Sequence, residues 1–487
     1  MRLALNKQFT IRNESGCSYL IKVNGVDGEA PKDYPSVTIL PPVIGFIISS
    51  AINTSLENAQ QNISSELGVS ESIIGKFLHN CMTPNNWIMS WNGIKLHFPS
   101  KLLWIENDKE IGYIHKIEEN PITADKRFIE KRPFAPININ LMLTTRCYTD
   151  CIYCYANRHL DKELTFEELQ SIIYQCKEIG VVNLNLTGGD FFVRKDWKEI
   201  LHIVSECEYK PFLSTKKPLN IEEITYILSK NISEIQFSLD SIDDNILSTL
   251  VKSPVNYSKK VEQMFEICDS LGLNLCVRTV LCNQNAELFK IRELYDFLSR
   301  HTCVKDWVIT PAFFSENKKE NYHSYEVDNS CLIKIKNFVT SKHSIFPIYL
   351  SKITDCGYKL QYYKDVEQYV TMNQKCFANS FSMSILASGE CTICEMLYNN
   401  PEYLLGNIRS ESIVQIWNSK KAWSLYSPNQ HMIYKESPCS MCTVFDKCRG
   451  SIAKKVCYVD MAKAYNNHSF SEPDPRCPTA NPINIIL

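Results

Sequence analysis

Three cysteines spaced C-x3-C-x2-C fall in the stretch Cys147-Tyr148-Thr149-Asp150-Cys151-Ile152-Tyr153-Cys154. Directly before it, residues 137–143 form an alternating apolar run that predicts a β-strand. Three thiolates on one loop can bind three irons of a cubane [4Fe–4S] cluster. The fourth iron is then left without a protein ligand, and it is open to a substrate or cofactor. Buried core cysteines are one alternative, and a zinc site with a fourth ligand nearby is another.

This spacing after a strand resembles the radical S-adenosylmethionine (radical SAM) superfamily. In that family the open iron binds the amino and carboxylate groups of SAM, and the cluster donates one electron that cleaves SAM to a 5′-deoxyadenosyl radical. The resemblance implies that Cys147, Cys151 and Cys154 are the catalytic cluster ligands. It also implies an electron donor such as a flavodoxin or ferredoxin. Tyr153, just before the last of these cysteines, is expected to lie against the adenine of SAM.

Residues 135–345 alternate strand and helix patterns, which predicts an α/β fold with a parallel sheet. A capping box at residues 165–168 begins the helix after the first strand, and Gly180 ends it. Six βα units favour a partial (β/α)6 TIM-like barrel that is open on one side, with the chemistry at the C-terminal ends of the strands. The six strands are predicted at residues 137–143, 181–187, 211–215, 234–239, 273–280 and 307–310.

Polar residues follow several of these strands. Gly188-Gly189-Asp190 comes after the second strand and matches the family's glycine-glycine-acid motif, which binds the amino group of SAM. Two residues without Cβ let the backbone approach a ligand closely, and a carboxylate can face an ammonium. This chain has Asp190 where glutamate is commoner. The resemblance further implies contacts to the ribose and carboxylate of SAM from Thr215, Ser238, Asp240 and Arg278, although Ser, Thr and Asp also cap turns constantly.

Eight of the 21 cysteines lie between residues 376 and 477. Their spacing resembles the SPASM extension of radical SAM proteins, which carries one or two auxiliary iron–sulfur clusters. The resemblance implies one auxiliary cluster bound by four cysteines, with zinc as the alternative. These four are Cys439, Cys442, Cys448 and Cys477.

The chain departs from that pattern at Ile452, where the family has a further cysteine, four residues after Cys448. The other auxiliary cluster keeps Cys376 and Cys394. Candidates to complete it are, in order of preference, Cys391, Cys457 and Cys356.

Glu395 follows Cys394 directly. In sulfatase-maturing relatives an aspartate at the matching place is thought to act as a base. Glu395 is therefore a candidate catalytic base, and a surface carboxylate is the alternative.

Residues 1–110 predict a separate winged-helix-like domain of short strands, two helices and a β-hairpin that turns at Asn92-Gly93. It resembles the leader-peptide recognition element of enzymes that modify ribosomally made peptides, in which an edge strand and the adjacent helix bind an extended leader. A plain winged-helix accessory domain is the alternative. The second helix offers only Lys76 against Glu71, which argues against DNA binding. Residues 111–134 are expected to form a linker, and residues 346–487 the SPASM-like domain.

The charge balance gives no sign of nucleic-acid or membrane binding, because 52 Lys and Arg face 54 Asp and Glu. The longest apolar stretch, residues 37–52, is interrupted by Pro41 and Pro42 and is too short to span a bilayer. No secretory signal opens the chain. A cytoplasmic protein with reduced thiols is expected, so clustered cysteines favour metal binding or catalysis over disulfides.

Together these features predict a radical SAM/SPASM peptide maturase. The leader of a precursor peptide would dock on residues 1–110. The core peptide would enter the open barrel, where hydrogen abstraction leads to an oxidative cross-link or another modification. One alternative is a sulfatase-maturing, formylglycine-forming enzyme, which typically needs no leader-binding domain. Others are a radical SAM enzyme acting on a small molecule and a non-catalytic peptide-binding relative.

Overall fold

The computed structural model describes residues 1–24, 35–106, 131–156, 162–313, 322–351, 363–373, 376–397, 400–465 and 469–482. Contacts divide the chain into two compact units. The first contains residues 1–137 and 180–183, and the second contains residues 138–179 and 184–487. Most of the expected linker, and Cys356, lie outside the described residues.

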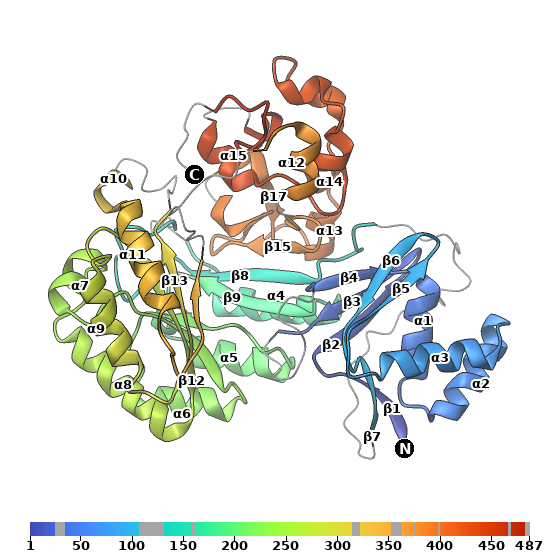
Figure 1. Cartoon of the computed structure of the whole chain (residues 1–487), viewed down its shortest axis with the longest axis horizontal. Coiled ribbons are helices and arrows are strands. Elements are labelled where there is room, and N and C mark those ends of the chain that lie inside the picture. The colour runs from blue at the N-terminus through green and yellow to red at the C-terminus, as the bar shows by residue number, and fades with distance from the viewer. Residues whose placement is uncertain are drawn as a thin grey trace. The chain divides into compact units, whose positions relative to one another are not determined.

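The first unit combines short antiparallel sheets with three helices (Figure 1). A three-stranded sheet has the order β2-β3-β4, β5 and β6 form the expected hairpin, and β1 pairs with β7. The apolar stretch of residues 37–52 forms β4 and α1, because Pro42 can occupy the first position of a helix. The elements are β1 Arg2–Leu5, β2 Phe9–Glu14, β3 Cys17–Lys22, β4 Val37–Leu40, α1 Pro42–Ala51, α2 Leu56–Leu67, α3 Glu71–Cys81, β5 Trp87–Trp91, β6 Ile94–Phe98 and β7 Leu103–Glu106.

The second unit contains the predicted partial barrel, and all six expected strands are present. The third strand is shorter than expected, because only Ser214 and Thr215 of residues 211–215 pair as a strand. A further parallel strand, β14, lies just beyond the expected border at residue 345 and pairs with β13. The strands are β8 Asn138–Thr144, β9 Asn183–Gly188, β10 Ser214–Thr215, β11 Glu234–Ser238, β12 Asn274–Leu281, β13 Val304–Pro311 and β14 Ile348–Leu350.

Helices follow the strands as the sequence predicts. The capping box before α4 is formed: the Thr165 hydroxyl accepts from the Glu168 amide at 3.3 Å, and the Glu168 carboxylate accepts from the Thr165 amide at 2.8 Å. The helices are α4 Phe166–Glu178, α5 Trp197–Glu206, α6 Ile221–Ser229, α7 Asp244–Leu250, α8 Tyr257–Leu271, α9 Leu288–Leu298, α10 Tyr322–Tyr325 and α11 Asn329–Thr340. Among the described residues, none of the helices has the length and apolar character needed to cross a membrane.

The C-terminal segment shares a sheet with the barrel, which the sequence did not predict. Strand β15 runs parallel to β8, with Ser382 opposite Asn138, and the sheet order is β17-β16-β15-β8-β9 (Figure 1). The expected border at residue 345/346 therefore separates strands of one sheet. The segment's main elements are α12 Val366–Met372, β15 Ser382–Ile385, β16 Glu390–Thr392, η3 Glu395–Leu397, β17 Leu404–Asn407, α13 Ile413–Trp417, α14 Lys420–Tyr426 and α15 Tyr458–Ala464.

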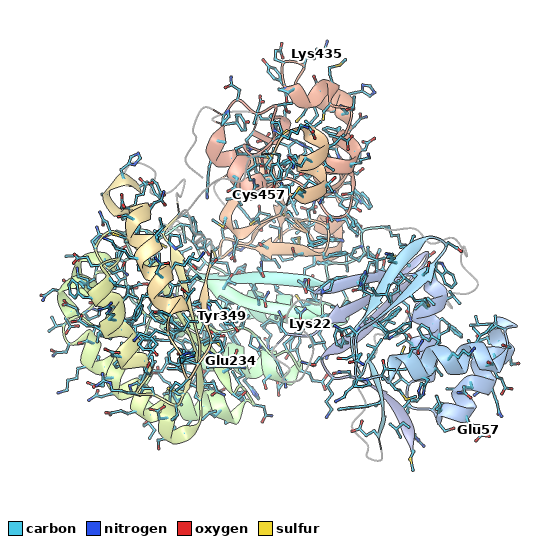
Figure 2. All side chains as sticks on the ribbon, viewed as in Figure 1. Lys22, Glu57, Glu234, Tyr349, Lys435 and Cys457 are labelled. Carbon is cyan, nitrogen blue, oxygen red and sulfur yellow. The ribbon has the colours of Figure 1, made fainter. Side chains whose placement is uncertain are left out.

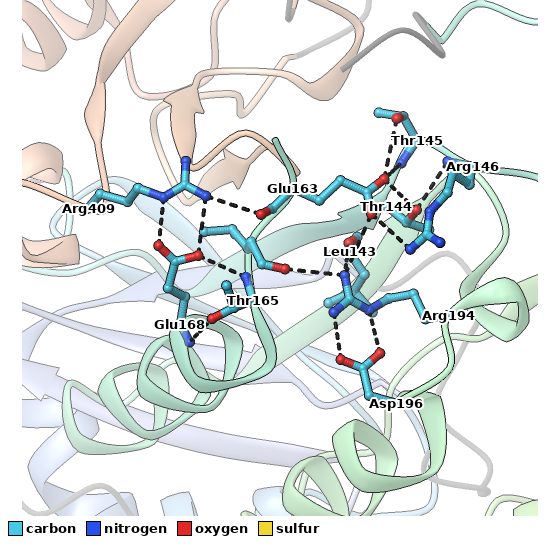
Figure 3. Close-up of polar contacts among 11 residues, drawn as sticks. Leu143, Thr144, Thr145, Arg146, Glu163, Thr165, Glu168, Arg194, Asp196 and Arg409 are labelled. Atoms are coloured by element: carbon cyan, nitrogen blue, oxygen red, sulfur yellow. Dashed lines mark hydrogen bonds and ion pairs between the residues drawn. The ribbon is translucent and has the colours of Figure 1, made fainter. Parts of the chain in front are cut away.

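Polar contacts on both sides of residue 164 link this segment to the start of the barrel (Figure 3). Arg409 forms a bidentate ion pair with Glu168, at 2.6 and 3.2 Å, and donates to the Glu163 carbonyl at 3.3 Å. The Glu163 carboxylate accepts from the Thr144 hydroxyl at 2.7 Å and the Thr145 amide at 3.0 Å, where β8 ends. One short segment therefore connects the C-terminal residues to the loop that follows β8.

We expect Arg409→Ala to cost about 1–2 kcal/mol of stability, because it removes a bidentate ion pair and leaves carbonyl groups without a donor. Thermal unfolding measures the change. Lys447→Ala is the matched control: its pair with Glu367 spans 3.8 Å between side chains 69% and 63% exposed, so we expect less than about 0.5 kcal/mol. Hydrogen bonding to Arg409 lowers the pKa of Glu168 from 4.5. The ion pair therefore stabilises the folded protein above pH 4.5, and this stabilisation is lost as the pH falls through the lowered pKa of Glu168. An Arg409→Ala effect that does not shrink in acid would contradict this account.

Candidate functional site

A cavity of about 320 Å³ lies at the C-terminal ends of the barrel strands. This volume is at the lower end of the range for small-molecule sites. Its lining brings together most residues that the sequence placed at the site and several that it did not. The expected ones are Cys147, Cys151, Tyr153, Cys154, Gly188, Gly189, Asp190, Thr215 and Ser238; the additional ones include Thr149, Tyr155, Ser214, Lys216, Gln236 and Phe313.

The loop with the three cysteines is held by backbone hydrogen bonds. The amides of Asp150 and Ile152 donate to the carbonyls of Val251 and Leu250, at 2.8 and 3.0 Å. Within the loop, the Cys154 amide donates to the Cys151 carbonyl at 3.2 Å. The end of α7 therefore fixes the loop conformation, and all three thiols line the same cavity. Burial raises the pKa of the Cys151 thiol, so its deprotonation requires a compensating positive charge.

Gly188 and Gly189 let the end of β9 pack directly against this loop. The Gly189 amide donates to the Thr144 carbonyl at 2.7 Å. A Cβ on Gly189 would lie 2.0 Å from the Arg146 carbonyl oxygen and 2.9 Å from the Cys147 sulfur, and a Cβ on Gly188 would lie 2.3 Å from the Thr144 carbonyl oxygen. Gly188 also has φ +130°, which other residues rarely adopt. Both glycines are therefore required by the backbone itself, next to the thiol that would bind iron.

Asp190 is buried and its carboxylate is used within the protein. One oxygen accepts from the Thr215 hydroxyl at 2.7 Å and from the amides of Lys216 and Lys217 at 3.1 and 3.2 Å. The other accepts from the Phe192 amide at 3.1 Å. Burial raises the pKa of Asp190 despite these bonds. Asp190 thus ties the loop after β9 to the loop after β10, and contact with the amino group of SAM stays a prediction.

Asp240 is the centre of a buried polar cluster beside the cavity. Its carboxylate accepts from the Tyr153 hydroxyl at 2.5 Å, from the Lys216 ammonium at 2.7 Å and from the Val280 amide at 2.8 Å. Burial alone would lower the pKa of Lys216, but Asp240 raises it. Burial, and then Asp240, raise the pKa of Tyr153 well above its ordinary value. Asp240 therefore fixes Tyr153 and Lys216 against the cavity.

Arg278 is directed elsewhere. It forms an ion pair with Asp306 and is not among the described residues that line the cavity. Ser238 does line it, together with Gln236, whose amide donates to the Ser214 hydroxyl at 2.8 Å. The expected roles of Ser238 and Arg278 toward SAM remain predictions.

A second group of thiols lies in the C-terminal segment. Cys439, Cys442, Cys448 and Cys477 line one pocket with mainly apolar neighbours. Arg449, only 1% exposed, donates to the Cys439 sulfur at 3.5 Å. The guanidinium also donates to the carbonyls of Phe470 and Glu472, and among the described residues no carboxylate pairs with it, so an anion at the sulfurs would balance its charge. A thiolate-bound iron–sulfur cluster supplies that anion, and the four residues fit such a group.

Two protein-family models match this chain. The model of the radical SAM superfamily matches residues 141–294, and that of the SPASM iron–sulfur cluster-binding domain matches residues 376–443. The chain therefore contains a radical SAM domain and a SPASM domain. The first match begins in β8 and includes the three-cysteine loop and Gly188-Gly189-Asp190. The second includes the cysteines from 376 to 442.

Two relatives match parts of this chain. PqqA peptide cyclase of Bradyrhizobium diazoefficiens is 27% identical over 154 residues, which are 31% of this chain and 40% of that protein. GTP 3′,8-cyclase of Campylobacter lari is 26% identical over 216 residues, which are 42% and 63% of the two chains. The chain thus spans less than two thirds of the length of either relative.

Solved structures agree on the fold. Streptococcus suis SuiB bound to its precursor peptide SuiA superimposes with a TM-score of 0.64, over 98% of this chain and 100% of that chain, at 15% identity. SuiB bound to S-adenosylmethionine gives the same TM-score at 14% identity. The expected architecture, a partial barrel with a C-terminal SPASM domain, is confirmed. The cofactors of these domains are SAM with its [4Fe–4S] cluster and auxiliary iron–sulfur clusters.

The candidate ligands of the auxiliary cluster that keeps Cys376 and Cys394 differ in their surroundings. Cys394 and Cys457 each interact electrostatically with Cys376. Cys391 is fully buried on β16, and its thiol interacts with Cys176 of α4. Within the described part of the chain, no Cys, His, Asp and Glu side chains form a group of three or more suited to one metal ion. Cluster ligation by individual cysteines therefore stays a prediction.

Glu395 reaches the radical SAM domain from the SPASM domain. It accepts from the Thr187 hydroxyl at 2.9 Å and also from Tyr155, which lines the cavity. Burial raises the pKa of Glu395. The residue is nevertheless partly exposed, so its role as a base stays a prediction.

Sequence reasoning missed Lys216 and Gln236. A signal for Lys216 was present, because it directly follows the third predicted strand, at the end where polar residues gather. Gln236 lies inside a strand, where alternation predicts only that one face differs from the other. A signal was nevertheless present, because Gln236 lies two residues before Ser238 on the same face of the strand, and Ser238 was already expected at the site.

We expect Gly189→Ala to weaken SAM binding to the reconstituted protein by about tenfold to a hundredfold, because the new Cβ overlaps the Arg146 carbonyl and crowds the Cys147 sulfur. Calorimetric titration with SAM measures the loss. Gly75→Ala is the matched control: its Cβ would meet only the flexible end of Gln60, at 2.7 Å. Unchanged SAM affinity in Gly189→Ala would contradict the described packing.

Proposed function

We propose that this chain is a radical SAM/SPASM peptide maturase, which modifies a residue of a ribosomally made precursor peptide. The supporting observation is that Glu395 of the SPASM domain bonds to Thr187 and Tyr155, at the edge of the cavity that the three thiols line. A carboxylate from the second domain thus accompanies the cluster loop of the first. When bound, the cluster and SAM supply a 5′-deoxyadenosyl radical that abstracts a hydrogen atom from the peptide. An electron donor such as a flavodoxin or ferredoxin is part of the proposal.

The residues of the chain position the reactants. Cys147, Cys151 and Cys154 would hold the cluster on a loop fixed by α7. Gly188 and Gly189 let the end of β9 pack directly against this loop, and Tyr153 offers an aromatic face held in place by Asp240. The fixed cavity would orient SAM and exclude water from a reactive species.

The peptide is expected to use the first unit for docking. Its three-stranded sheet has β4 at one end, and β4 leads directly into α1. An edge strand next to a helix suits an extended leader, which can add a further strand to the sheet. The relatives support a peptide substrate by analogy, since one is a peptide cyclase and SuiB was solved with its precursor peptide. The bond that forms in the product is expected to be an oxidative cross-link or another modification.

The test compares two synthetic peptides with the reconstituted full-length protein: a leader-bearing precursor and the same core without its leader. We expect SAM cleavage with both, and product by mass spectrometry mainly with the leader-bearing peptide. Cys151→Ser should abolish SAM cleavage, because a cubane needs all three thiolates of this loop. Cleavage that persists in Cys151→Ser would exclude the cluster assignment. Equal product from both peptides would exclude the docking role.

Glu395→Gln tests the proposed base. It keeps the shape and the bonds from Thr187 and Tyr155 but removes the negative charge. We expect about a hundredfold less modified peptide, with SAM cleavage retained, because the variant loses a proton acceptor and not a cofactor ligand. Glu395→Asp keeps the carboxylate and should recover part of the product yield. Full product formation by Glu395→Gln would show that this carboxylate is not the base.

A further inference from the structure

One cysteine that the family uses as a cluster ligand is missing from the SPASM domain of this chain. The family's ligand position is occupied by Ile452, which has no atom that binds iron. Spacing alone favoured Cys391 as the substitute. The structure places Cys391 with its sulfur in the core, 0% exposed and near Cys176 of α4. A thiol in that place is a packing residue.

The segment that contains Ile452 and Cys457 lies beside Cys376. Cys376 and Lys454 form an antiparallel bridge, with the two amides donating to the opposite carbonyls at 2.7 and 3.0 Å. Cys457 follows only three residues after this bridge. The backbone pairing therefore brings residues 454–457 to Cys376 regardless of any assumption about metal.

The elements that begin at the two other cysteines are in contact with each other. Cys394 directly precedes η3, and Cys457 directly precedes α15. Helices η3 and α15 pack together. Figure 2 labels Cys457 within this part of the SPASM domain. Each thiol thus lies at the start of one of two packed helices, and burial and, to a smaller extent, Cys376 raise the pKa of both.

Each of the three sulfurs accepts a hydrogen bond from the backbone amide of a residue two or three positions later in the chain. The donors are the amides of Ala378, Met396 and Asp460, for Cys376, Cys394 and Cys457 respectively. Amide–sulfur bonds of this kind stabilise the thiolate ligands of iron–sulfur clusters and tune their potential.

Cationic side chains face the same group. Lys454 and Arg476 act on Cys376, Lys463 acts on Cys394, and Arg476 also acts on Cys457. Carboxylates are also present: Glu395 acts on Cys394, and Asp460 acts on Cys376 and Cys457. Arg476 pairs with Asp460 at 3.2 Å and with Asp474 at 2.6 Å. Buried thiols facing positive charge are suited to bind iron as thiolates.

We propose that Cys457 replaces the cysteine that is missing at position 452, so that Cys376, Cys394 and Cys457 together ligate one auxiliary iron–sulfur cluster, called here the first. The second is the cluster expected at Cys439, Cys442, Cys448 and Cys477. Each thiol gives up its proton when it binds iron. The proposal uses the cluster-binding character of the SPASM domain and does not depend on the peptide substrate or on SAM cleavage.

The test counts iron and sulfide in the full-length chain after anaerobic reconstitution. The background carries Cys147→Ala, Cys151→Ala and Cys154→Ala, so that only auxiliary clusters contribute. We expect Cys457→Ala to lose the iron of one cluster, about two or four irons per chain, as Cys376→Ala does, with the cluster at Cys439, Cys442, Cys448 and Cys477 retained. Cys391→Ala is the matched control and should lose none. The retained second cluster also reports that the domain is folded.

Two results would overturn the proposal: an unchanged iron content in Cys457→Ala, or the loss appearing in Cys391→Ala instead. A measurement on the wild-type chain covers the case in which Cys457→Ala does not fold. Iodoacetamide is applied to the loaded protein, and alkylated cysteines are identified by mass spectrometry. Cys331, partly exposed like Cys457, should react in the loaded protein. Cys457 should react only after a chelator and an oxidant remove the clusters, and its alkylation in the loaded protein would exclude it as a ligand.

Discussion

The close approach of Gly188 and Gly189 to the loop after β8 is the constraint on which the site depends. Two backbone segments meet where no Cβ fits, with the Arg146 carbonyl and the Cys147 sulfur on the far side. This contact fixes the end of β9 relative to the cysteine loop, and Asp190 then carries the same alignment to the loop after β10. Thr215, Lys216, Asp240 and Tyr153 follow from there through hydrogen bonds. The cavity is thus shaped mainly by contacts between loops, while the barrel strands supply their starting points.

Charge in the two domains is prepared in different ways. In the radical SAM domain the buried Lys216 is balanced by Asp240, so the pair is complete without a ligand. In the SPASM domain Arg449 is buried against a cysteine sulfur, and the described residues give it no carboxylate. The first arrangement orients side chains around a small molecule that arrives and leaves. The second suits a resident anion whose loss would leave a buried charge uncompensated. The SPASM domain should therefore depend on its cluster for stability more than the barrel does.

The sequence predicted the features that rest on local chemistry. The capping box before α4, the strand before the cysteine loop, the hairpin at Asn92-Gly93 and the double glycine each need specific residues at fixed spacing. Long-range pairing was beyond it: nothing in residues 382–385 shows that β15 pairs with β8. The third strand was overestimated for a similar reason: Leu213 accepts one hydrogen bond from the Gln236 amide, but only Ser214 and Thr215 pair as a strand. Spacing ranked Cys391 ahead of Cys457, but spacing carries no information on burial, and the structure places Cys391 in the core.

The pairing of β15 with β8 also sets an order of events during synthesis. Asn138 of β8 is synthesised 244 residues before Ser382, its partner in β15. At typical elongation rates that interval is roughly 12–50 s. During this time β8, which leads into the cysteine loop, lacks the partner strand that pairs with one of its edges in the finished sheet. Insertion of iron into the loop before the chain is finished would therefore act on an unfinished sheet, and delivery after release would act on a closed one.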